Sequence, residues 1–208
     1  MFRTALLCIA FSLIVSCSSE KKAETSQPAA KPAAKEAQFD TGRTAFQRMY
    51  LSARGWAPDA KPFRLQSHFT ADAPTAEGKA GLWRASFASP SRRMMKLFVS
   101  SGLVGPDAPE QGVSFSAEDS WSASNNSTQP FDIAFLKVDS DKAYEVAQKN
   151  GGDKLTKKDP KQPVIFLLSW DAANNQLVWH VIYGEKPTDA KLRLAVDATS
   201  GAFLHVEK

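Results

Sequence analysis

In the second half of the chain, hydrophobic and polar positions follow first a helical and then an alternating pattern. Asp139 or Ser140 can cap a predicted helix whose apolar face holds Ala143, Tyr144 and Ala147, and residues 150–152, Asn-Gly-Gly, should end it. An apolar run and three alternating segments then predict four strands, at 163–170, 176–184, 191–198 and 202–207. The pattern therefore predicts a helix followed by a four-stranded antiparallel meander.

The first half repeats this order of elements. Residues 41–55 place four apolar side chains at helical spacing and end in a glycine. Strands are expected at 62–69, 82–89 and 92–102, and the turn-rich connection 103–130 contains one possible strand at 113–116. Because the order of elements, a Pro, a Trp and a final Gly agree, we interpret the chain as a diverged internal duplication. Trp83 and Trp179 occupy equivalent strand positions and are expected in the core.

The N-terminus has the pattern of an export signal. Arg3 precedes an apolar run, 5–15, which is shorter than the ~20 residues that a membrane-spanning helix needs. Residues 14–17, Ile-Val-Ser-Cys, resemble the lipobox of bacterial lipoproteins. The resemblance implies removal of the signal peptide, 1–16, and a membrane anchor through lipid on Cys17. With Ser at position 18, it favours the outer membrane, with the protein facing the periplasm.

Composition separates a tether from a folded region. Residues 17–38 follow as the lipidated cysteine and a flexible tether, because 18–38 contain no aromatic or large aliphatic side chain to bury. From residue 39 onward the chain has no cysteine, which excludes disulfide, zinc-thiolate and thiol-nucleophile chemistry there. That region has 21 Lys and Arg against 19 Asp and Glu, and so small an excess argues against nucleic acid as a partner.

With these elements in place, residues 139–206 resemble the PepSY domain family. The resemblance is carried by a strand Trp, then a strand ending in Val-Asp-Ala-x-x-Gly and a further apolar strand; here these are Trp179, Val196, Asp197, Ala198, Gly201 and Phe203-Leu204. In the first half, residues 98–102 have Ser in place of the Asp. The resemblance implies an α+β fold with two tandem units, each a helix packed on a three- or four-stranded antiparallel meander. The architecture would be similar to that of the beta-lactamase inhibitory protein, with units at 39–105 and 131–208 and a connector at 106–130.

The same resemblance sets the functional expectation. PepSY-like domains are extracytoplasmic, non-catalytic modules, which implies binding or inhibition of an envelope protein or peptide, on the open face of the sheet. No serine-nucleophile elbow, phosphate-binding loop or zinc-protease helix motif occurs in the sequence, and we expect no cofactor. We therefore expect a binding module and not an enzyme. Two alternatives stay open: a hydrolase of envelope polymers, and a structural subunit of an outer-membrane assembly.

Few residues stand out as candidates for a site. His68, His180 and His205 each fall in a predicted strand, where a hydrogen-bonded histidine is commoner than a metal ligand. Asp197 precedes a turn, and we expect it to accept backbone N–H bonds that fix this turn. Trp121 lies in the polar connector without apolar neighbours in sequence, and two interpretations stay open: it is a candidate anchor for binding a partner, or it covers a sheet edge.

Overall fold

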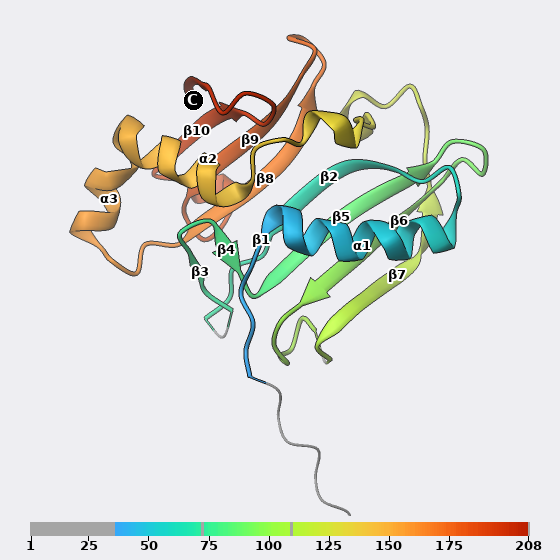
Figure 1. Ribbon diagram of the computed structural model, residues 1–208, viewed down its shortest axis with the longest axis horizontal. Helices are drawn as coiled ribbons and strands as arrows, with labels where there is room; N and C mark the ends of the chain where they lie inside the picture. The colour runs from blue at the N-terminus through green and yellow to red at the C-terminus, as the bar shows by residue number, and fades with distance from the viewer. Residues whose placement is uncertain (1–35, 72, 109, 208) are drawn as a thin grey trace, which may run out of the picture. The chain divides into compact units, whose positions relative to one another are not determined.

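The computed structural model describes residues 36–71, 73–108 and 110–207, which form an α+β fold. Eight antiparallel strands build one sheet in the order β11-β10-β9-β8-β2-β5-β6-β7. Helices α1 and α2 cover the same face of this sheet (Figure 1). The expected signal peptide, the expected lipidation at Cys17 and the expected tether up to residue 35 lie outside the described residues. Within the described part of the chain, no helix is long and apolar enough to cross a membrane.

The second half confirms the predicted meander. Four consecutive strands pair with one another: β8 (Val164–Asp171), β9 (Gln176–Tyr183), β10 (Leu192–Asp197) and β11 (Phe203–Glu207). Helix α2 (Ser140–Ala147) begins after Asp139, as predicted. The helical path does not end at 150–152, however. It bends through η3 (Gln148–Gly152), where Gly151 has a φ of 117°, and continues as α3 (Asp153–Lys158), because no breaker follows the glycines.

The first half also follows the predicted order. It contains α1 (Gly42–Trp56), β2 (Lys61–Ser67), β5 (Leu82–Ser89) and β6 (Met94–Ser101), with a small sheet of β1 (Asp40–Thr41), β4 (Lys79–Ala80) and β3 (Thr75–Ala76). Strand β7 (Gly112–Ser120) is longer than the expected 113–116 and pairs with β6 at the sheet edge. Part of the expected connector 106–130 therefore belongs to the sheet. The rest contains one short turn of helix, η1 (Asn126–Thr128), and a second, η2 (Ile133–Phe135), follows after it.

The two halves share one continuous sheet because β2 pairs antiparallel with β8, with Leu65 opposite Leu168. On the helix-covered face the side chains of both halves form one apolar core, to which α1 and α2 both contribute. Trp83 and Trp179 lie at its centre and are 1% and 0% exposed, which confirms their predicted core positions. The sheet and its core are thus completed within a single chain.

The start of α1 is capped by residues from the start of α2. The first N–H groups of a helix have no partner within that helix and need one from elsewhere. Here the Gly42 N–H donates to Ser140 Oγ at 2.7 Å, and the Arg43 N–H donates to Asp139 Oδ1 at 2.8 Å. The Ser140 hydroxyl in turn donates to the Gly78 carbonyl at 2.6 Å. The two helices therefore begin at the same place, and buried hydrogen bonds hold their first turns together.

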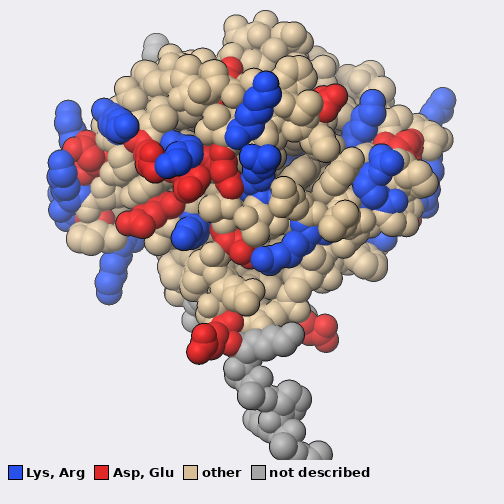
Figure 2. All heavy atoms as spheres, viewed as in Figure 1, with Lys and Arg blue, Asp and Glu red and all other residues tan. Residues whose placement is uncertain are grey.

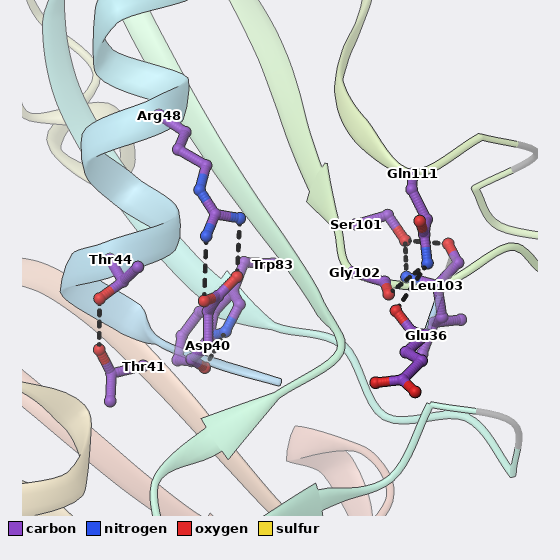
Figure 3. Close-up of polar contacts among 10 residues, drawn as sticks. All are labelled: Glu36, Asp40, Thr41, Thr44, Arg48, Trp83, Ser101, Gly102, Leu103 and Gln111. Carbon is purple, nitrogen blue, oxygen red and sulfur yellow. Dashed lines mark hydrogen bonds and ion pairs between the residues drawn. The ribbon is translucent and has the colours of Figure 1, made fainter. Parts of the chain in front are cut away.

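Residues just before α1 are also fixed to the sheet (Figure 3). Arg48 donates to both carboxylate oxygens of Asp40, at 2.7 and 3.1 Å, and the Trp83 indole N–H donates to the Asp40 carbonyl at 3.0 Å. The Gln38 N–H donates to the Gly102 carbonyl at 2.8 Å, beyond the end of β6. The last residues of the expected tether, 36–38, therefore belong to the folded domain.

The turn between β10 and β11 is tied as predicted. Asp197 Oδ1 accepts the N–H groups of Thr199 and Ser200, each at 2.7 Å. Gly201 completes the turn with a φ of 79°, a conformation that glycine adopts without strain. Asp197 thus has the structural role expected of it.

Candidate binding groove

A groove of about 560 Å³ opens at the C-terminal end of α1. One wall is formed by Tyr50 and Arg54 of α1, and the floor by the loop that leads into β2. The opposite wall belongs to residues 121–133, which follow β7 and cross this end of the domain. Segments that are about 70 positions apart in the sequence therefore meet in one concave surface, of the kind that ligands and peptides occupy.

Trp121, the residue singled out from the sequence, forms part of this wall. Its backbone N–H donates to the Arg93 carbonyl at 2.9 Å, and its indole N–H donates to the Thr128 carbonyl at 3.1 Å. These two bonds fix the half-buried ring between the groove and a second hollow of about 430 Å³. Phe131 and Ile133 line the same groove as Trp121, although the residues next to Trp121 in the sequence are polar.

The chain beyond Trp121 is held in place by a buried aromatic side chain. Phe131 is 3% exposed, and its N–H donates to the Pro62 carbonyl at 2.9 Å. Asp132 then caps η2 by accepting the Ala134 N–H at 2.8 Å. This arrangement leaves Ile133 and Phe135 41% and 40% exposed beside the groove. The lining of the groove therefore includes the exposed apolar side chain of Ile133.

The charged side chains of the groove differ in whether they already have a partner within the chain. Asp59 accepts the Ser89 hydroxyl at 2.7 Å and the Ser91 N–H at 2.8 Å, and these bonds lower the pKa of its carboxyl to about 2. Asp132 is occupied as the helix cap. Arg54 and Lys61 are exposed, and neither forms an ion pair with any residue that the structure describes. The groove thus holds two carboxylates, which accept hydrogen bonds from neutral donors, and two exposed cations, and acidic and basic groups are likewise mixed across the helix-covered face as a whole (Figure 2).

A second polar cluster lies on the opposite face of the sheet. His180 alternates with Trp179 and points away from the core, as expected from the sequence. Its Nε2 lies 3.1 Å from Ser169 Oγ, and its Nδ1 lies 2.6 Å from Glu207 Oε1. Arg193 Nε lies 3.4 Å from the second oxygen of Glu207. Burial raises the pKa of Glu207, but the hydrogen bond from His180 and the charge of Arg193 together bring it below its ordinary value.

The order Ser169, His180, Glu207 is that of a nucleophile, a base and an orienting acid. Because an ionised carboxylate only accepts, the Nδ1–H of His180 donates to Glu207, and the Ser169 hydroxyl can then donate to Nε2 of the neutral ring. Acyl transfer also needs N–H donors aimed at a developing oxyanion. Ser169 lies within an interior strand, opposite Arg64 on one side and Val178 on the other, where backbone N–H groups serve the sheet. The cluster thus offers a positioned hydroxyl without adjacent backbone donors.

The other two histidines are separate from this cluster. His68 Nε2 lies 3.3 Å from Asp107, and burial, followed by the charge of Arg84, lowers the pKa of His68. His205 is exposed and is separated from His180 by β10. Across the described residues, no group of three or more His, Cys, Asp or Glu side chains is arranged to hold a metal ion.

Comparison with known proteins supports the fold. No protein-family model matches the sequence, and no curated protein matches it. One solved structure, of a protein from Clostridium difficile 630 that is provisionally classed as a lipoprotein, is similar, with a TM-score of 0.51 and 14% sequence identity. The match covers 83% of this chain and 95% of that one. At this identity the likeness shows a shared α+β architecture with a large antiparallel sheet.

Proposed function

We propose that this chain is a lipid-anchored envelope protein that binds an acidic, partly apolar segment of another protein in the groove beside Trp121, without catalysing a reaction. The observation that carries the proposal is a fixed indole ring in a groove whose two cations, Arg54 and Lys61, are exposed and form no ion pair with any described residue, whereas its two carboxylates already accept hydrogen bonds. Aromatic and arginine side chains in a concave site are the groups that most often anchor a protein partner. An extended segment with acidic and aliphatic side chains would pair with the two cations and contact the apolar part of the lining.

Two observations support the lipid anchor. Residues 14–17 have the lipobox pattern, with Cys17 as the residue to be lipidated, and a polar tether follows. The fold is similar to that of the Clostridium difficile protein provisionally classed as a lipoprotein. With Ser at position 18, the anchor would lie in the outer membrane and the domain would face the periplasm.

The arrangement of the two halves supports a tandem, PepSY-like ancestry. In each half a helix is followed by four strands that pair consecutively, apart from the short β3 and β4. In each half, too, the indole N–H of a buried Trp donates to the backbone just before the helix. The Val-Asp-Ala-x-x-Gly segment that carries the resemblance forms a turn closed by the Asp197 carboxylate.

The groove lies at the C-terminal end of α1, whereas the first described residues, 36–41, lead into its N-terminal end. A helix of 15 residues is about 22 Å long at 1.5 Å per residue, so the two ends are separated by about that distance.

A peptide titration tests this proposal. We would titrate the purified full-length protein in detergent with two eight-residue peptides that share their aliphatic residues, one rich in Glu and the other rich in Lys. The probe is the indole N–H resonance of Trp121, identified by its loss in Trp121→Phe. We expect the acidic peptide to shift this resonance and the basic one to leave it unchanged.

Two charge reversals make the titration specific. Arg54→Glu should weaken binding of the acidic peptide, whereas Lys158→Glu, at the exposed end of α3, should not. Equal shifts with both peptides, or none with the acidic one, would contradict the proposal.

The Ser169–His180–Glu207 cluster favours a second candidate, the hydrolase of envelope polymers. That function requires Ser169 Oγ to attack an acyl carbon while His180 takes its proton. A fluorophosphonate probe, followed by peptide mass spectrometry, distinguishes the two functions. Labelling of Ser169 that disappears in His180→Ala would support the hydrolase. A folded protein that remains unlabelled would exclude this route.

A further inference from the structure

Two arginines lie diagonally opposite each other on the neighbouring interior strands β2 and β5. The core residues of these strands alternate with side chains that point to the opposite face of the sheet, away from the helices. On that face Arg64 lies opposite Ser86, and Gln66 lies opposite Arg84. The register of β2 shifts before Arg64, and from Arg64 onward its pairing with β5 is regular. These four residues therefore form one compact group, the polar quartet.

The polar quartet is rich in hydrogen-bond donors and has a positive charge in excess. Arg64 Nη2 donates to Gln66 Oε1 at 3.2 Å, so the NH2 group of Gln66 remains as a donor. Arg84 lies 3.3 Å from Asp107, and His68 Nε2 lies 3.3 Å from the same carboxylate. Arg64 forms no ion pair with any residue that the structure describes. Two guanidinium charges are thus set against one carboxylate.

Arg64 is partly surrounded by protein and is still open to a ligand. The residue is exposed, and yet burial lowers the pKa of its guanidinium. A partly desolvated cation without a counter-ion attracts an anion more strongly than a cation in bulk water does. On the β8 side Ser169 lies opposite Arg64, but its hydroxyl already lies 3.1 Å from His180 Nε2. On the β5 side the Ser86 hydroxyl forms no hydrogen bond with any described residue, so this side offers the unused donors.

A hollow of about 200 Å³ begins at Ser86, on the same face of the sheet. Its lining includes the apolar side chains of Met95, Leu97 and Ala117. Ser86 lies directly opposite Leu97, whereas the acidic residue of the lining, Asp119, lies opposite Met95, farther from Arg64. The hollow adjoins the bulge of β7, where the register against β6 shifts, and such bulges commonly border functional sites. A polar group and an apolar hollow thus meet at Ser86.

We propose that this face of the sheet binds a small monocarboxylate with a short alkyl tail, with the carboxylate between Arg64 and Ser86 and the tail in the hollow. A guanidinium presents paired N–H donors that match the two oxygens of a carboxylate. The excess of one positive charge fits a single negative charge, and the apolar lining fits the tail. The site shares no residue with the groove beside Trp121, so it can hold or fail independently of the function proposed above.

A series of small ligands tests the site. We would titrate the full-length protein, held in phosphatidylcholine nanodiscs, with hexanoate, with hexylammonium, and with acetate and inorganic phosphate as two anions without an alkyl tail. The probe is the Nε–H resonance of Arg64, identified by its loss in Arg64→Gln. We expect hexanoate to shift this resonance saturably and hexylammonium to leave it unchanged. Acetate and phosphate should bind about tenfold more weakly than hexanoate, because neither buries methylene groups in the hollow.

Two variants separate the two halves of the site. The methyl resonances of Leu97 report on the hollow, and we expect Arg64→Gln to abolish their shift with hexanoate, whereas Lys158→Gln, at the exposed end of α3, should not. Ser86→Leu, which fills the mouth of the hollow and keeps Arg64, should reduce hexanoate to the weak binding of acetate. The proposal is wrong if hexanoate gives no saturable shift, if hexylammonium or phosphate binds as tightly, or if either Arg64→Gln or Ser86→Leu leaves hexanoate binding unchanged.

Discussion

The rings of Trp83 and Trp179 meet edge to face at the centre of the core, with their centroids 6.4 Å apart and their planes at 71°. Each indole N–H donates to the carbonyl of a residue just before a helix, Asp40 at 3.0 Å and Val138 at 2.9 Å. Gly42 packs over both rings, because a Cβ atom there would lie 2.7 Å from Trp179 and 3.0 Å from Trp83. The two halves of the chain are thus joined by a repeated interaction around one point.

Replacing Trp179 with phenylalanine should weaken this junction. Trp179→Phe removes part of a fully buried ring and leaves the Val138 carbonyl without its indole donor. We expect a loss of about 2–3 kcal/mol in the free energy of unfolding, from the cavity and the lost hydrogen bond. Urea denaturation followed by circular dichroism measures it. Trp170→Phe, at a half-buried ring, is the matched control and should cost less; equal losses would show that the Trp179 hydrogen bond contributes nothing.

Ser140 should contribute to stability through its position between the two helices. Its hydroxyl accepts from Gly42 and donates to Gly78, and the side chain is fully buried. Ser140→Ala leaves both backbone groups unpaired, and we expect a loss of about 1–3 kcal/mol. Thermal unfolding compared with Ser124→Ala, an exposed serine in the connector, provides the measurement. If the two variants have the same melting temperature, the capping of α1 by Ser140 does not stabilise the fold.

Asp197 should stabilise the last hairpin and have no effect on binding. Asp197→Ala removes the acceptor of the Thr199 and Ser200 N–H groups, and we expect a loss of about 1–2 kcal/mol, as for other turn and cap residues. Hydrogen exchange should show faster exchange in β10 and β11, while peptide binding in the groove is retained. An unchanged melting temperature would refute the structural role.

Asp59 should titrate at unusually low pH because Ser89 and Ser91 hold its charged form. The pKa is about 2 in the folded protein against an ordinary value of 3.8. A lowered folded pKa contributes stability that is present above pH 4 and is lost as the pH falls through 2. Ser89→Ala should raise the pKa of Asp59 toward 3.8, as followed by carboxyl NMR, whereas Ser124→Ala should not change it. If the titration midpoint of Asp59 is the same in Ser89→Ala, the Ser89 hydroxyl does not stabilise the ionised carboxylate.

Much of the fold could be predicted from the sequence because most of its strands have apolar and polar side chains in alternation or a continuous apolar run. The strands of the second half and the core positions of Trp83 and Trp179 follow from that pattern. The full length of β7 does not follow from that pattern, because most of its residues are exposed and its polar sequence resembles that of a loop. Helix α3 was missed because Gly151 and Gly152 look like an end, whereas they only redirect the chain.

The site was less predictable, since it depends on register and on distant segments. Trp121 could be noticed as an aromatic residue in a polar connector. Its groove could not, because Tyr50 and Phe131 meet there only through the docking of the connector on Pro62. The pairing of His180 with Glu207 depends likewise on the alignment of β9, β10 and β11, which no local pattern encodes.

Site-specific photo-crosslinking in cells tests the central claim most directly. A photoreactive phenylalanine analogue would replace Gln129, which lines the groove, or Lys158, which is exposed at the end of α3. We predict a discrete adduct with another protein from position 129 that is lost when Trp121→Ala is added, and no such adduct from position 158. The same adducts from both positions, or none from position 129, would contradict the claim that this groove binds a partner.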